Sequence, residues 1–212
     1  MFHLDEINVQ DILSIHSLVI NEGITFIIGE SGGGKSTILK LINRYVVPTE
    51  GNIYYHEQPI TAFPIVSYRR KVPLLSQTPF ISEGSIERNL QYGRELNNSS
   101  LVGKKELEDL LTALRLSKGL QDESTELSGG EKQRVNLGRF LLLDAKVYLM
   151  DEPCSSLDEE LKHDVYSYMV DRIRQKGASA IIVTHSEGIA KKFADTIIRV
   201  QRGDLNVETR TD

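Results

Sequence analysis

The stretch "ITFIIGESGGGKST", residues 24–37, constrains the fold more than any other part of the chain. A nearly unbroken run of β-branched residues leads into a glycine-rich loop, after which helical spacing begins at Lys35 and stops before Pro48. The apolar positions of this expected helix are Ile38, Leu41, Ile42 and Tyr45. A strand that is apolar on both faces is typical of a parallel sheet covered by helices. We therefore predict an α/β protein with ligand groups at the carboxyl ends of its strands.

Other segments extend this pattern along the chain. Two further apolar runs, 146–151 and 179–185, each end in polar residues and flank a helix-like stretch at 157–177. Residues 7–20 instead alternate between apolar and polar side chains, which predicts antiparallel strands with one solvent-exposed face. Residues 77–127 contain helix-like stretches separated by turn-forming residues, so a helical insertion is expected there.

Composition narrows the classes of protein that fit. The 212 residues suffice for one large domain or for a core with an inserted subdomain. The single cysteine, Cys154, cannot form an internal disulfide, which suits a reducing compartment. The sequence has no apolar run long enough to span a membrane and no secretory leader, so a cytoplasmic location is expected. Short, scattered basic clusters and a net charge of −5 predict a solvated surface and no nucleic-acid partner.

The glycine loop matches the phosphate-loop pattern G-x-x-x-x-G-K-[ST] between a strand and a helix, which is the context that the pattern requires. Its backbone N–H groups can converge on phosphate oxygens, and the helix that follows adds the positive end of its dipole. Lys35 is expected on the β- and γ-phosphates, the Ser36 hydroxyl on Mg²⁺, and Thr37 on a further phosphate oxygen. The predicted nucleotide cradle is Gly29, Glu30, Ser31, Gly32, Gly33, Gly34, Lys35, Ser36 and Thr37.

Two adjacent carboxylates, Asp151 and Glu152, end the apolar run "VYLMD". Alternation along a strand sends them to different faces, so they can serve different purposes. Asp151 is suited to holding Mg²⁺ at this strand end. Glu152 can accept a proton from the attacking water as a general base. By itself such a pair is more often a solvated turn, but beside a complete phosphate loop the catalytic interpretation is favoured.

Six motifs stand in the order found in ATP-binding cassette (ABC) ATPases: "GESGGGKST", "LLSQTPF", "LSGGEKQR", "VYLMDEP", "SSLDEE" and "IIVTHS". The sequence resembles this family over essentially its whole length, and most closely its small bacterial stand-alone subunits. The resemblance implies a P-loop NTPase fold with a RecA-like parallel-sheet core, an N-terminal antiparallel β-subdomain and an inserted α-helical subdomain. It implies one ABC ATPase domain over 1–212, with the core at about 1–76 and 135–212 and the helical subdomain at about 77–134.

The resemblance also implies roles for single residues. Gln77 resembles the glutamine that reaches the metal and the hydrolytic water while its loop touches the transport partner. His185 resembles the switch histidine that contacts the γ-phosphate, and Asp158 resembles the aspartate that contacts the opposite subunit. Taken alone, His185 and Gln77 would more often be ordinary core, surface or loop residues, and only the accompanying motifs favour the functional interpretation.

A second glycine loop resembles the family's signature loop, at Ser128, Gly129 and Gly130. It opens an expected helix and so makes a second anion site that can close over a γ-phosphate. In this family two cassettes meet head to tail, and each ATP lies between the phosphate loop of one and the signature loop of the other. One cassette per chain implies a homodimer or a pair with a sister subunit.

The expected function is therefore an ATP-binding and hydrolysing subunit that uses ATP and Mg²⁺ to power a separate membrane permease from the cytoplasmic face. One alternative is a non-transport cassette ATPase acting in DNA repair or on the ribosome. That alternative predicts coiled-coil insertions, zinc modules, paired cassettes or basic surfaces, which the sequence lacks. Another is a nucleotide-dependent switch without useful turnover, against which Glu152 and His185 both argue.

The sequence departs from the family pattern where adenine would bind. Many members place an aromatic residue ahead of the phosphate-loop strand to stack on the base, but "INVQDIL" offers Val9 or nearby aliphatic residues. Phe2 could substitute only if the fold brings it close.

Overall fold

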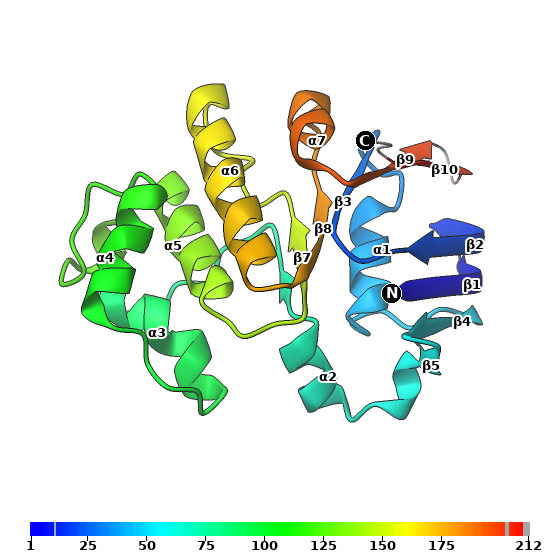
Figure 1. Ribbon diagram of the computed structural model, residues 1–212, viewed down its shortest axis with the longest axis horizontal. Coiled ribbons are helices and arrows are strands. Elements are labelled where there is room, and N and C mark those ends of the chain that lie inside the picture. Colours follow the sequence, from blue (N-terminus) through cyan, green and yellow to red (C-terminus); the bar gives the residue numbers. More distant parts are fainter. Residues whose placement is uncertain (11, 202–203, 210–212) are drawn as a thin grey trace. The chain divides into compact units, whose positions relative to one another are not determined.

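A computed structural model describes residues 1–10, 12–201 and 204–209 (Figure 1). The chain divides into two compact units. The first comprises Met1–Leu74, Ala145–Glu152 and Gly177–Asp212, and the second comprises Leu75–Asp144 and Pro153–Lys176. The single domain over 1–212, with its helical part at 77–134, stays a prediction.

A six-stranded sheet in the order β10-β9-β3-β8-β7-β6 forms the centre of the first unit. The strands are β3 (Ile24–Gly29), β6 (Leu74–Leu75, where the first unit ends), β7 (Val147–Asp151), β8 (Ser179–Val183), β9 (Thr196–Gln201) and β10 (Asp204–Thr209). Strand β3 pairs in parallel with β8 and β9, and β7 pairs in parallel with β8. Every residue of β7 and β8 is buried, as expected for parallel strands covered on both faces. The predicted parallel core is confirmed.

An antiparallel sheet in the order β2-β1-β4-β5 forms the rest of the β-structure of the first unit. Its strands are β1 (Phe2–Val9), β2 (Leu13–Ile20), β4 (Glu50–Tyr55) and β5 (Gln58–Pro59). Buried and exposed residues alternate along β2, which confirms the predicted strands with one solvent-exposed face. Asp11, part of that alternating segment, lies outside the described residues.

Helix α1 (Lys35–Ile42) shares one hydrophobic core with both sheets of the first unit. The sequence predicted that this helix continues through Tyr45, and this is wrong: the helix ends at Ile42 and Tyr45 is 70% exposed. Arg44 takes a left-handed conformation (φ 61°), and the Tyr45 N–H donates to the carbonyl of Lys40 at 2.8 Å. This is the hydrogen-bond pattern of a Schellman cap, which terminates a helix. The first unit also contains α2 (Ile65–Lys71), α7 (Glu187–Phe193) and the 3₁₀ turn η1 (Ile60–Ala62).

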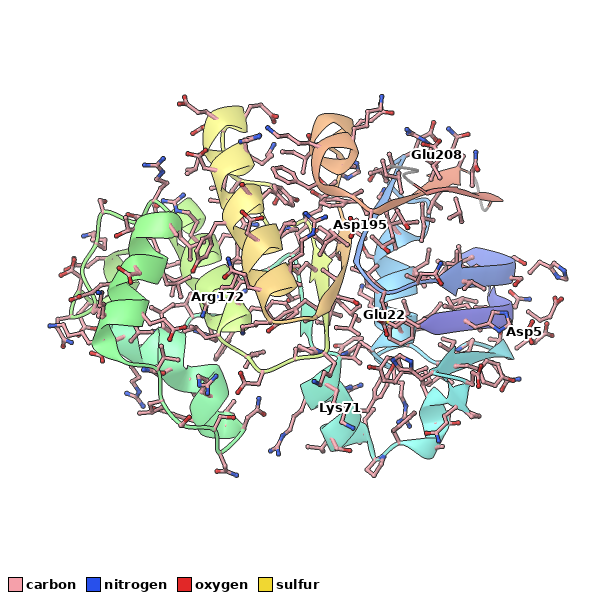
Figure 2. All side chains as sticks on the ribbon, viewed as in Figure 1. Asp5, Glu22, Lys71, Arg172, Asp195 and Glu208 are labelled. Atoms are coloured by element: carbon pink, nitrogen blue, oxygen red, sulfur yellow. The ribbon has the colours of Figure 1, made fainter. Side chains whose placement is uncertain are left out.

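Helices form the second unit. Its elements are α3 (Ile86–Leu96), α4 (Lys104–Ala113), η2 (Ser124–Glu126), α5 (Gly129–Leu141) and α6 (Glu159–Gln175). Helix α5 contacts α3, α4 and α6. A Cβ on Gly138 would lie 2.9 Å from Leu114 and 3.0 Å from Leu90, so glycine permits this close packing. Arg172, labelled in Figure 2, joins α6 to Glu106 of α4 at 2.5 Å.

Among residues 1–10, 12–201 and 204–209, none of the helices has the length and apolar character that crossing a bilayer requires.

Gly51 of β4 tests the packing of the antiparallel sheet. It faces an irregularity in β1, has φ +86°, and a Cβ there would lie 2.2 Å from the carbonyl oxygen of Glu6. We expect Gly51→Ala to lower the free energy of unfolding by about 2–4 kcal/mol, because both the conformation and the space exclude a side chain. Gly188→Ala, in α7 of the same unit with nothing within 4 Å among the described residues, should be neutral or slightly stabilising. Equal urea-unfolding curves for the two variants would contradict this account.

Candidate nucleotide-binding site

The loop between β3 and α1 is shaped by glycines at its two ends. Gly29 has φ +144°, and a Cβ there would lie 2.1 Å from the carbonyl oxygen of Val200, so no other residue fits. Gly34 has φ +89° and precedes α1, which no side chain caps. A Cβ on Gly32 would meet nothing within 4 Å among the described residues. The loop therefore leaves open space beside an uncapped helix N-terminus, which is the setting that binds phosphate.

The ammonium group of Lys35 lies inside this loop. The residue is 5% exposed, and its Nζ donates to the carbonyl oxygens of Gly29 at 2.9 Å and Glu30 at 2.5 Å. Burial lowers the pKa of Lys35, while the nearby carboxylates of Glu152 and Asp151 raise it. The structure thus places a buried cation where the sequence predicts the phosphate-binding lysine.

Ser36 and Asp151 meet although they lie 115 positions apart in the sequence. The Ser36 hydroxyl donates to Oδ1 of Asp151 at 3.0 Å, at the end of β7. Among the described residues there is no cluster of three or more His, Cys, Asp or Glu side chains that could hold a metal by itself. One hydroxyl and one carboxylate nevertheless fit Mg²⁺, which is commonly held by few protein oxygens together with substrate phosphates and water.

Glu152 and His185 form a second pair at the same end of the sheet. Nε2 of His185 lies 3.3 Å from Oε1 of Glu152, and the Glu152 N–H donates to the carbonyl of Val183 at 3.1 Å. Glu152 adopts a left-handed backbone (φ 51°), a strained conformation for a residue other than glycine. The two adjacent carboxylates therefore have different neighbours, because β7 ends at Asp151 and the left-handed turn at Glu152 directs its side chain elsewhere, not because of strand alternation.

The other predicted site residues belong to the second unit. Gln77 is exposed, and Ser128 is the N-cap of α5. Asp158 is the N-cap of α6, where its Oδ1 accepts from the Leu161 N–H at 2.9 Å.

Two residues near the signature loop were missed in the sequence. Glu131 completes a capping box with Ser128, and the spacing S-x-x-E could have revealed it. Gln133 accepts from the Ser156 backbone N–H at 3.3 Å and donates to the Ser155 hydroxyl at 3.3 Å. No local pattern indicates this second contact, because it joins segments that are distant in the sequence.

Comparison with known proteins agrees with this geometry. Residues 13–155 match the family described as "ABC transporter". The chain belongs to this family. It is 34% identical over 183 residues to ABC transporter I family member 17 of Arabidopsis thaliana, covering 86% of this chain and 69% of that protein. It is 32% identical over 196 residues to the Fe(3+) ions import ATP-binding protein FbpC 2 of Pectobacterium atrosepticum, covering 91% of this chain and 56% of that protein.

The fold of this ABC chain is shared with a solved structure titled "Structure of ATP binding subunit of ABC transporter". The TM-score is 0.83 at 25% identity, over 98% of this chain and 89% of that chain. The expected fold class, a P-loop NTPase with an antiparallel β-subdomain and inserted helices, is confirmed.

Phe2 is not available to stack on adenine in this ABC chain. It is 1% exposed, and its ring lies 4.9 Å from that of Tyr55 within the core. The turn at Ile12 and Leu13 lies against the phosphate loop instead, since a Cβ on Gly34 would lie 3.0 Å from Cδ1 of Leu13. Ile12 is 53% exposed, so the side chain beside the loop is aliphatic.

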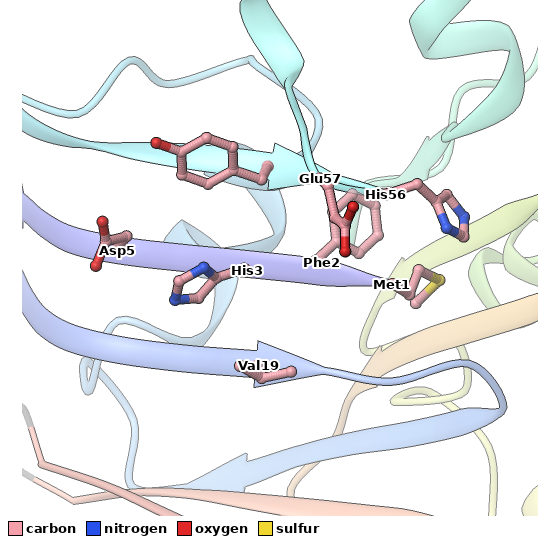
Figure 3. Close-up of a pocket in the computed structure, with 8 residues that line it drawn as sticks. Met1, Phe2, His3, Asp5, Val19, His56 and Glu57 are labelled. Atoms are coloured by element: carbon pink, nitrogen blue, oxygen red, sulfur yellow. The ribbon is translucent and has the colours of Figure 1, made fainter.

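A separate hollow of about 780 Å³ lies on the antiparallel sheet (Figure 3). It is lined by Met1, Phe2, His3, Asp5, Val19, Tyr54, His56 and Glu57. The rings of His3 and Tyr54 stack there at 5.9 Å. None of its lining residues belongs to the phosphate loop or to the acidic pair, so this hollow is distinct from the predicted nucleotide site.

Lys35→Ala tests the assignment of the cradle. We expect the affinity for Mg-ATP to fall roughly 100-fold, because the charge-assisted contacts to the phosphates are lost. Isothermal titration calorimetry with each variant measures this. Lys40→Ala, an exposed lysine of the same helix, is the matched control and should bind as the parent does. Equal affinities for the two variants would show that Lys35 does not contact the nucleotide.

Proposed function

We propose that this chain is the ATP-binding and ATP-hydrolysing subunit of an ABC transporter and powers a separate membrane permease. The observation that carries the proposal is the convergence of two pairs at the end of β7. Ser36 meets Asp151 at 3.0 Å, and His185 meets Glu152 at 3.3 Å, beside a buried lysine. A binding module without chemistry needs neither the carboxylate nor the histidine at this place.

The phosphate loop binds the triphosphate in this proposal, from Gly29 to Thr37. Lys35 leaves the loop carbonyls that it now contacts and pairs with the β- and γ-phosphates, an exchange of neutral acceptors for charged ones. Ser36 and Asp151, together with Gln77, hold Mg²⁺. When bound, this ion neutralises charge that develops on the phosphate oxygens.

Hydrolysis then depends on Glu152 and His185. Glu152 accepts a proton from the attacking water, and its backbone bond to Val183 holds the carboxylate at the end of the sheet. His185 contacts the γ-phosphate from a position within 3.3 Å of that base. Because Glu152 is buried and His185 is exposed, the base is protected while the histidine can meet a nucleotide that arrives from solvent.

The second half of each site comes from a partner chain, either a second copy or a sister subunit. Ser128 and Gly129 are exposed at the N-terminus of α5 and present donors and a positive dipole end to a γ-phosphate. Gly130 adds an N–H in the first turn. Asp158, exposed at the start of α6, contacts the opposite subunit. ATP therefore joins two chains head to tail, and its hydrolysis separates them.

The permease docks beside Gln77 and the helices of the second unit, which places the chain on the cytoplasmic face of the membrane. The exposed ring of Phe80, three positions after Gln77, supports this surface as an interaction site. Cargo and direction of transport depend on residues of the permease. One relative is named for the import of Fe(3+) ions, and that cargo is stated of the relative alone.

Glu152→Gln tests both the base and the dimer. We expect turnover to fall at least 100-fold, because a general base typically contributes that much, while ATP binding persists. With Mg-ATP the variant should sediment as a dimer. Glu22→Gln, an exposed carboxylate of the same unit, should hydrolyse ATP normally and serves as the control. A Glu152→Gln variant that stays monomeric at saturating ATP and hydrolyses at the parental rate would refute the proposal.

Ser128→Arg tests the signature loop. The bulky cation should prevent closure over the partner's γ-phosphate, so hydrolysis is lost while nucleotide affinity at Lys35 changes little. Phosphate release and equilibrium titration measure the two effects separately. Ser117→Arg, at an exposed position of the same unit, should leave both unchanged. Normal turnover in Ser128→Arg would exclude a role for this loop in catalysis.

A further inference from the structure

The carboxylate of Glu131 occupies both polar donors of Ser128. Its Oε2 accepts from the Ser128 backbone N–H at 2.9 Å and from the Ser128 hydroxyl at 2.7 Å. In return the Ser128 oxygen accepts from the Glu131 N–H at 3.3 Å. The signature loop is thus already bonded to an anion that comes from its own chain.

We propose that Glu131 is a stand-in for the γ-phosphate and must leave before the partner's ATP can bind. The inference rests on the proposed function, which assigns the Ser128 hydroxyl to that phosphate. One hydroxyl hydrogen cannot serve the carboxylate and the phosphate at once. The phosphate also carries negative charge, so two anions that compete for the same donors of Ser128 repel each other.

The carboxylate remains charged while it holds this position. The hydrogen bonds from the backbone and the side chain of Ser128 lower the pKa of Glu131, and the nearby charges of Arg134 and Lys118 lower it further. At neutral pH the loop therefore contains a full negative charge. Glu131 is partly exposed, so its carboxylate can leave Ser128 without entering an apolar environment.

A purely structural role for Glu131 makes a different prediction from a gating role. Glu131 and Ser128 form a capping box, which stabilises the start of α5 whatever binds there. Glutamine at the same position also completes a capping box, but it carries no charge. Glu131→Gln therefore keeps the cap and removes the repulsion, whereas Glu131→Ala removes both.

The decisive experiment uses Glu152→Gln as the parent, so that hydrolysis does not deplete the ATP. The ATP concentration for half-maximal dimer is measured by sedimentation at low and at high salt. We expect Glu131→Gln to lower this concentration about tenfold at low salt, since a like charge close to the phosphate is removed. The difference should shrink near 1 M salt, where exposed charges are screened within about 3 Å.

Two further variants separate charge from stability. Glu126→Gln removes an equal charge nearby, from a residue that pairs with Lys118 at 3.5 Å, and should leave the ATP requirement unchanged. Glu131→Ala should lower both the melting temperature and the ATP requirement. If Glu131→Ala raises the ATP requirement while Glu131→Gln leaves it unchanged, the residue acts only as a cap and the inference is overturned.

The outcomes also distinguish this inference from the proposed function. A parent that never dimerises with ATP overturns the proposed function, and the inference with it. A parent that dimerises, with the same ATP requirement as its Glu131→Gln derivative at both salt concentrations, overturns the inference alone.

Discussion

The site depends on the interaction between the buried ammonium group of Lys35 and the carboxylates of Asp151 and Glu152. Burial lowers the pKa of Lys35, and the carboxylates of Glu152 and Asp151 at the end of β7 offset part of that effect. The strand order β3-β8-β7 brings the ends of these strands to one edge of the sheet. Every proposed catalytic contact of the first unit is made at that edge.

The two helix N-termini that we propose bind phosphate differ in how their backbone N–H groups are satisfied. Helix α1 begins at Lys35, and its N-cap Gly34 provides no side-chain cap, so its first turn can accept phosphate directly. Helix α5 begins with a complete capping box, so its first turn is occupied by its own chain. This asymmetry fits a nucleotide that binds first to the phosphate loop and only later to a signature loop.

Much of the architecture could be predicted because its signals are local. The apolar run before Gly29, the glycine loop and the helical spacing after Lys35 are contiguous and each has a physical cause. The prediction that α1 extends to Tyr45 was wrong because a left-handed Arg44 ends the helix, and hydrophobic spacing does not reveal such a residue. The contact of Gln133 with Ser155 and Ser156 was missed because it joins residues more than twenty positions apart.

The sequence by itself determined the family, the phosphate loop and the order of the motifs, since these are short patterns that do not depend on distant residues. Only the tertiary structure decided that Ser36 meets Asp151, that Glu152 meets His185, and that Phe2 is buried in the core. The physical reason is that strand order determines which of these side chains lie next to one another. Strand order results from packing the whole chain, and no local stretch encodes it.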